Sequence, residues 1–191
     1  MNLPNKLTLL RIVAVPVLVL IMLLPEISSI SSAVCSWIAA CLFVLAGITD
    51  TIDGRIARAR HLITDFGKFM DPIADKLLTC SCMIMLTYIG KLHPVATILF
   101  IAREFIISGF RLVAASKGVV IAADSLGKIK TLLQMIFIPA LILNDCYPFS
   151  RLQPLYNLVC IVIVWITVFI SVLSCIRYIM NNKGVIDFHD C

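Results

Sequence analysis

The chain has 191 residues, of which 61% are hydrophobic and only 14% are charged, and its mean hydropathy is +1.04. A soluble domain of this length is far more polar, so the composition indicates a helical membrane protein. The net charge of +5 is modest and no basic tract carries interleaved aromatic residues, which argues against nucleic-acid binding. The eight cysteines form no C-x-x-C pair, so neither a zinc site nor a redox motif is predicted.

Six hydrophobic runs follow one another along the chain: residues 7–24, 32–50, 69–89, 95–115, 127–143 and 155–179. Each approaches or exceeds the roughly 17–25 residues needed to cross the hydrocarbon core. Because the bilayer offers no water to backbone groups, such runs must be helices. The first run lacks a clean small-residue cleavage site and is interpreted as a retained helix. The sequence predicts an all-α polytopic membrane protein with six transmembrane helices, forming a single domain over residues 1–191.

The basic residues indicate the orientation of these helices. Six spans place both termini on one side, and 14 of the 16 lysines and arginines fall at the termini, the 2–3 and 4–5 loops and the adjoining helix ends. The positive-inside rule makes that side cytoplasmic, which suits a protein of the plasma membrane. Arg11, in the first run, is expected to snorkel to the near interface. Tyr178, late in the sixth run, is interpreted as an interfacial or packing aromatic.

Four aspartates stand where carboxylates are expensive, at the cytoplasmic ends of the second and third predicted helices: Asp50, Asp53, Asp71 and Asp75. Spacings of three and four residues place each pair on one helix face, and a short loop would bring the two faces together. Four such carboxylates cannot all ionise unaided, whereas two divalent cations would balance them. Oxygen ligands suit Mg²⁺, Mn²⁺ or Ca²⁺. The alternative is a set of interfacial acids paired with the nearby Arg55, Arg58 and Lys76.

Residues between the two aspartate pairs point to a phosphate ligand. Gly54 and Gly67 have no side chain, so a ligand or backbone can approach closely. Arg58 can face the same cavity, and a guanidinium beside a two-cation carboxylate site suits phosphate. Cations that bridge phosphate oxygens commonly support phosphoryl transfer.

The pattern Asp50-x2-Asp53-Gly54-x2-Ala57-Arg58-x8-Gly67-x3-Asp71-x3-Asp75 resembles the full signature of the CDP-alcohol phosphotransferase family. Residues 2–11, 66–76, 103–111 and 127–131 are similar to family members that use glycerol 3-phosphate. The resemblance implies a six-helix enzyme, a homodimer, with its active site between helices and open to the cytoplasm. It implies transfer of a phosphatidyl group from CDP-diacylglycerol to glycerol 3-phosphate, giving phosphatidylglycerophosphate and CMP in bacterial phospholipid biosynthesis.

The resemblance also assigns roles to residues. The four aspartates would hold two divalent cations, Mg²⁺ or Mn²⁺, and Asp75 would be the general base for the acceptor hydroxyl. The positions that match the donor-binding part of the family are Asn5, Thr8, Gly54, Ala57, Arg58, Thr64 and Gly67.

The acceptor, a small dianion, needs cations, and Arg111, Lys128 and Lys130 lie near the cytoplasmic ends of the fourth and fifth predicted helices. Ordinary positive-inside residues are an equal alternative for them. Arg103 and Glu104 lie deep in a span, where charges indicate a functional or buried-pair role. Adjacent helical residues point about 100° apart, so each is expected to meet another helix or the cavity, not its neighbour.

Two other functions stay open on the sequence. A family member that uses another acceptor, such as inositol phosphate or serine, would carry the same donor signature. A cation transporter would also carry intramembrane acids, but these would be spread through the membrane depth.

Overall fold

The computed structural model describes residues 3–59, 65–119, 121, 125–146 and 148–185, with the side chains of all but residues 3–7, 50–59, 65–69, 71, 72, 150 and 185. This part of the chain is helical and contains no strand. The long helices are α1 (Leu3–Ile27), α2 (Ser32–Ala59), α3 (Asp65–Tyr88), α4 (Pro94–Ser116), α5 (Ser125–Ile142) and α6 (Gln153–Asn181). Two short 3₁₀ helices, η1 (Phe149–Leu152) and η2 (Lys183–Val185), flank α6.

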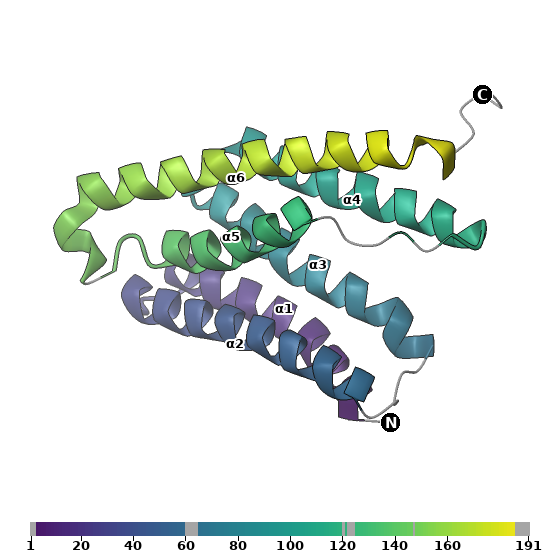
Figure 1. Ribbon diagram of the computed structural model, residues 1–191. Coiled ribbons are helices and arrows are strands. Elements are labelled where there is room, and N and C mark those ends of the chain that lie inside the picture. Colours follow the sequence, from purple (N-terminus) through teal and green to yellow (C-terminus); the bar gives the residue numbers. More distant parts are fainter. Residues whose placement is uncertain (1–2, 60–64, 120, 122–124, 147, 186–191) are drawn as a thin grey trace.

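Consecutive helices run in opposite directions, so the start of α1 and the end of α6 lie toward the same end of the bundle (Figure 1). The helices form a ring in which α1 packs against α2 and α3, α3 against α4, α4 against α6, α6 against α5, and α5 against α2. The sequence predicted that α2 and α3 would face each other directly. Within the described residues they contact each other only slightly, because α1 packs against both.

The outer surface of the bundle is apolar on every long helix. Large hydrophobic side chains are exposed there, among them Leu20, Leu45, Ile84, Ile98, Leu132 and Phe169. Four segments are long and apolar enough to cross a bilayer: Thr8–Ile27, Ser32–Thr49, Ser125–Ile142 and Gln153–Asn181. A surface of this kind suits lipid and not water, which confirms the predicted polytopic membrane protein.

The interior is a close-packed layer of side chains from all six helices. Leu18, Phe43, Leu86 and Phe100 are fully buried there. The rings of Phe100 and Phe137 stack with centroids 5.5 Å apart, which joins α4 to α5. Burying a side chain of this size contributes about 1.5–3 kcal/mol when the alternative is water.

The helix boundaries differ from the hydrophobic runs at two places near the site. The second run ends at residue 50, but α2 continues to Ala59, and α3 begins at Asp65, before the third run. Hydrophobicity marks the stretch that meets lipid, whereas a helix can continue past it into water. The aspartates of the signature therefore lie within helices and not at their termini.

Candidate active site

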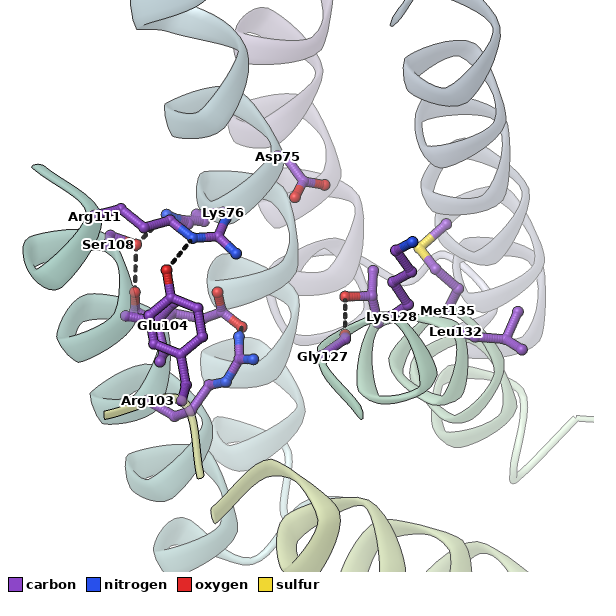
Figure 2. Close-up of a pocket in the computed structure, with 13 residues that line it drawn as sticks. Asp75, Lys76, Arg103, Glu104, Ser108, Arg111, Gly127, Lys128, Leu132 and Met135 are labelled. Atoms are coloured by element: carbon purple, nitrogen blue, oxygen red, sulfur yellow. Dashed lines mark hydrogen bonds and ion pairs between the residues drawn. The ribbon is translucent and has the colours of Figure 1, made fainter. Parts of the chain in front are cut away.

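A cavity of about 660 Å³ opens between α3, α4, α5 and the end of α6. Its charged lining consists of Asp75, Lys76, Arg103, Glu104, Arg111 and Lys128. Figure 2 shows Lys76, Ser108 and Arg111 on one side of the view, the α5 residues on the other, and Asp75 above them. Charged side chains inside a membrane protein mark a functional site by default.

Asp75 joins the cavity to the signature region of the sequence. It lies in α3, where its backbone carbonyl accepts a hydrogen bond from Thr79 Oγ1 at 3.1 Å. Three cations act on its carboxylate: Arg11 of α1, Lys130 of α5 and the adjacent Lys76. The carboxylate is thus surrounded by positive charge from three helices.

The other predicted metal ligands occupy helical positions on the elements that the sequence indicated. Asp50 and Asp53 lie in the last three turns of α2, and Asp71 lies one turn before Asp75 in α3. Their side chains lie outside the described residues, as do those of Asn5, Ala57, Arg58 and Thr64 and the surroundings of Gly54 and Gly67. The side chains that the structure describes contain no group of three or more metal ligands, but Asp75 is the only one of the four signature aspartates among them.

α1 contributes two buried polar side chains to the interior, and one of them, Arg11, acts on Asp75. Thr8 is 3% exposed and Arg11 is 4% exposed. The expectation that Arg11 snorkels to the interface was wrong, because its side chain turns inward, where the charge of Asp75 attracts it. A buried arginine is tolerated where a carboxylate offsets its desolvation.

Glu104 is the centre of a buried charge network. Its Oε1 accepts from Lys130 Nζ of α5 and lies 3.4 Å from Arg103 Nη1. Arg103 Nη2 in turn lies 3.4 Å from Ser174 Oγ of α6. The network therefore connects α4, α5 and α6. The predicted separation of Arg103 from Glu104 was wrong in part: each meets another helix, but the long arginine side chain also bends back to its neighbour.

Gly127 lets α5 approach this network closely. A Cβ at this position would lie 3.1 Å from Arg103 Nη2 and 3.8 Å from Ser174 Oγ. A Cβ there would require the flexible end of Arg103 to shift by a few tenths of an ångström, and glycine permits the close approach without that shift.

Lys76 and Ser108 form a second polar connection, between α3 and α4. Lys76 Nζ donates to Ser108 Oγ, and Ser108 Oγ donates to the backbone carbonyl of Glu104. Both side chains line the cavity. A role for Lys76 here was missed from the sequence, where it was counted only as a possible partner of the aspartates.

Arg111 lies two turns after Arg103 on α4 and is held differently. Its Nε donates to the hydroxyl of Tyr178 at 3.1 Å, and its guanidinium carbon lies 5.5 Å from the centroid of that ring. Tyr178 does pack, as predicted, with an edge-on contact to Phe110 at 5.7 Å. However, it also lines the cavity, which its position near the end of α6 did not reveal.

The three predicted acceptor residues are placed in two different environments. Arg111 and Lys128 line the cavity, whereas Lys130 is 2% exposed and ion-paired with Glu104. The spacing of two residues explains the difference, because Lys128 and Lys130 point to different sides of α5. Among the described residues, neither Lys76 nor Arg111 forms an ion pair, although Asp75 acts on Lys76 from a greater distance.

Comparison with known proteins gives consistent matches over nearly the whole chain. The family model described as CDP-alcohol phosphatidyltransferase matches residues 1–179. A Bacillus subtilis protein named CDP-diacylglycerol–glycerol-3-phosphate 3-phosphatidyltransferase is 42% identical over 188 residues, which cover 95% of both chains. A Rickettsia bellii protein of the same name is 41% identical over 183 residues, covering 95% of this chain and 96% of the relative.

Proposed function

Because the chain belongs to the CDP-alcohol phosphatidyltransferase family, we propose that it transfers the phosphatidyl group of CDP-diacylglycerol to glycerol 3-phosphate. The products are phosphatidylglycerophosphate and CMP. The protein is a membrane transferase, and relatives whose names state this reaction match 95% of its length. The observation that carries the proposal is the position of Asp75 on the wall of a cavity rich in unpaired cations.

The donor would bind at the signature region. Asp50, Asp53, Asp71 and Asp75 would hold two divalent cations, Mg²⁺ or Mn²⁺, since carboxylate oxygens are the ligands that these ions prefer. When bound, the cations would offset the charge of the pyrophosphate and of the leaving CMP. The remaining proposed contacts to the nucleotide and phosphates are Asn5, Thr8, Gly54, Ala57, Arg58, Thr64 and Gly67.

Asp75 would take the proton of the attacking hydroxyl. The acceptor oxygen forms a bond to the phosphorus that carries the diacylglycerol, the bond from that phosphorus to CMP breaks, and the hydroxyl proton passes to the carboxylate. Asp75 lies where the two substrates would meet, since it belongs both to the donor signature and to the cavity wall.

The acceptor phosphate would bind to Arg111, Lys128 and Lys76 across the cavity. None of these cations forms an ion pair among the described residues, and a phosphate dianion would supply a direct counter-charge. Lys130 has a different role in this proposal, because Glu104 already neutralises it.

The arrangement in the membrane follows from the same site. We place the cavity end of the bundle and both termini in the cytoplasm, where CMP and glycerol 3-phosphate are soluble, and the acyl chains of the donor stay in the bilayer. A homodimer is also proposed, from the resemblance of the sequence to its family.

The test is a direct assay of the purified protein with Mg²⁺ and CDP-diacylglycerol. Glycerol 3-phosphate, serine and inositol phosphate are offered separately, and both CMP and the lipid product are measured. Of the three acceptors, we expect only glycerol 3-phosphate to give CMP and a lipid product. Product with serine or inositol phosphate instead would transfer the assignment to that acceptor, and the absence of CMP with every acceptor would overturn it.

Two aspartate variants separate the roles within the site. Asp75→Asn keeps the shape and one oxygen but has no basic carboxylate, so turnover should fall about 10²–10⁴-fold while donor binding largely persists. Asp53→Asn should weaken donor and metal binding as well, because it removes a ligand charge near the leaving group. Asp145→Asn, in the α5–α6 connection at the opposite end of the bundle, is the matched control and should retain normal turnover. Equal loss of donor binding in the first two variants would make Asp75 only a metal ligand.

A further inference from the structure

Two arginines on α4 are held by different kinds of partner, one by an anionic side chain and the other by a neutral one. Arg103 lies 3.4 Å from the carboxylate of Glu104, whereas Arg111 donates to the neutral hydroxyl of Tyr178. A carboxylate fixes a guanidinium and offsets part of its charge, although Glu104 is also paired with Lys130. A phenol fixes the guanidinium and leaves the charge available. Of the two, Arg111 is therefore the one prepared to receive an anion.

The ring of Tyr178 is a rigid support. The residue is 4% exposed, and its ring packs edge-on against Phe110, with centroids 5.7 Å apart, in a small cluster that also contains Ile107 and Cys175. Since the ring is fixed by α4 and α6 together, the hydroxyl has a defined position at the cavity wall.

This support determines which part of the guanidinium remains available. Arg111 has five N–H groups, and the one on Nε donates to Tyr178 at 3.1 Å. The ring face below, 5.5 Å from the guanidinium carbon, restricts rotation of the side chain further. The four N–H groups on Nη1 and Nη2 remain, and they form the fork that binds two phosphate oxygens at once.

The charges around Arg111 agree with an anionic ligand at this point. Lys76 interacts electrostatically with Arg111 as well as with Asp75, and the two like charges line the same cavity (Figure 2). Like charges at a cavity wall repel each other unless an anion lies between them.

We propose that Tyr178 is a positioning residue, which orients Arg111 to bind the phosphate of a small phosphomonoester acceptor in the cavity. The proposal rests on the proposed function for the identity of the acceptor. It adds that affinity for the phosphate depends on the phenol hydroxyl near the end of α6, which itself need not touch the substrate.

The test is Tyr178→Phe, which keeps the ring, the contact to Phe110 and the stacking with Arg111, and removes only the hydroxyl. We expect the KM for glycerol 3-phosphate to rise about tenfold, the approximate value of one hydrogen bond to a charged group. The KM for CDP-diacylglycerol and the kcat at saturating acceptor should change less than about twofold, because a uniform loss of binding raises KM alone.

Tyr156→Phe is the matched control. Tyr156 is also on α6 and its hydroxyl also donates a hydrogen bond, to the carbonyl of Ala140 at 2.9 Å, but the residue is not part of the cavity lining. It should leave the KM for glycerol 3-phosphate unchanged. An equal rise in both variants would assign the effect to general loosening of α6 and overturn the proposal.

A second comparison tests whether the effect passes through Arg111. Lysine has no Nε–H, so in an Arg111→Lys background the further change Tyr178→Phe should raise the acceptor KM by less than about twofold. The full tenfold rise in that background would refute the positioning role.

Direct titration of glycerol 3-phosphate into the protein, followed by calorimetry, separates this inference from the proposed function. Binding that weakens about tenfold in Tyr178→Phe supports the positioning role even if the wild-type protein shows no turnover, in which case only the proposed function fails. Normal turnover with an unchanged dissociation constant in Tyr178→Phe would refute the positioning role alone. No binding to the wild-type protein would refute it as well.

Discussion

Removal of the Glu104 carboxylate is expected to destabilise the protein more than removal of the lysine that it binds. Glu104→Gln leaves both Lys130 and Arg103 in the interior without this counter-charge. Lys130→Gln leaves Glu104 with Arg103 still 3.4 Å away. The two substitutions therefore break the same ion pair but leave different numbers of uncompensated charges.

The expected losses of stability in Glu104→Gln and Lys130→Gln follow from the burial of the two side chains. The side chains of Lys130 and Glu104 are 3% and 13% exposed, so this is a buried pair. Breaking such a pair from one side costs about 3–5 kcal/mol, which we assign to Glu104→Gln. Lys130→Gln should cost about 1–3 kcal/mol, the loss of one hydrogen bond to a charged group. At about 2–4 °C per kcal/mol for a chain of this length, Glu104→Gln should lower the Tm by about 6–20 °C.

The assay is thermal unfolding of the single and double variants in detergent. In Glu104→Gln/Lys130→Gln one of the stranded cations is gone, so the double variant should be more stable than Glu104→Gln alone. The pair between Lys91 and Asp145, at 2.8 Å with side chains 15% and 60% exposed, is the control. Lys91→Gln also removes a hydrogen bond to the carbonyl of Ile142 and should cost about 1–2 kcal/mol, less than Glu104→Gln. A double variant whose loss equals the sum of the single losses, or a Glu104→Gln variant as stable as Lys91→Gln, would refute the reasoning.

Three further outcomes are expected. Excess chelator should abolish CMP release and Mg²⁺ or Mn²⁺ should restore it, because clustered carboxylates need counter-cations; full turnover after verified metal removal would contradict this. A reporter fused after Cys191 should stay in the cytoplasm and a tag between α1 and α2 should lie outside, since 14 of 16 basic residues gather on one side; an externally accessible C-terminus would reverse the orientation. The hydrogen bond from Lys91 holds the pKa of Asp145 below its usual range. The pair therefore stabilises the folded protein fully at pH values above the unfolded pKa of about 3.9. This stabilisation is lost as the pH falls through the lower pKa of the folded state. Asp145→Asn should therefore make the Tm less sensitive to acid below about pH 4, and an unchanged dependence would contradict it.

The number of helices and the charged end of the bundle could be predicted from the sequence, because both depend on local composition. A run of about 20 apolar residues must form a helix in lipid whatever its neighbours are. The helix ends were harder to predict, because α2 continues to Ala59 through a polar segment that contains Gly54, a poor helix former. Hydropathy reports contact with lipid, and it contains no signal for where a helix stops in water.

The contacts between distant helices could not be predicted. Arg111 and Tyr178 are 67 residues apart in sequence and belong to helices that only the packing of α4 against α6 brings together. Likewise, the sequence gives no reason to distinguish Lys130 from Lys128, whereas the structure pairs only Lys130 of α5 with Glu104 of α4. The sequence shows which charged residues lie near one end of a membrane protein. Which of these charges are neutralised depends on the side chains that the neighbouring helices place beside them.

The charge balance of the cavity also bears on the choice between acceptors. Four basic and two acidic side chains line it, so two positive charges remain in excess. A phosphomonoester dianion would bring this balance to zero, whereas serine, a zwitterion, brings no net charge and would leave the cations of the cavity unmatched. The divalent cations proposed for the aspartates would add positive charge beside Asp75 and increase this preference. Phosphorylated acceptors are therefore favoured over serine by electrostatics alone, and the choice between glycerol 3-phosphate and inositol phosphate is left to the shape of the cavity around the hydroxyl groups.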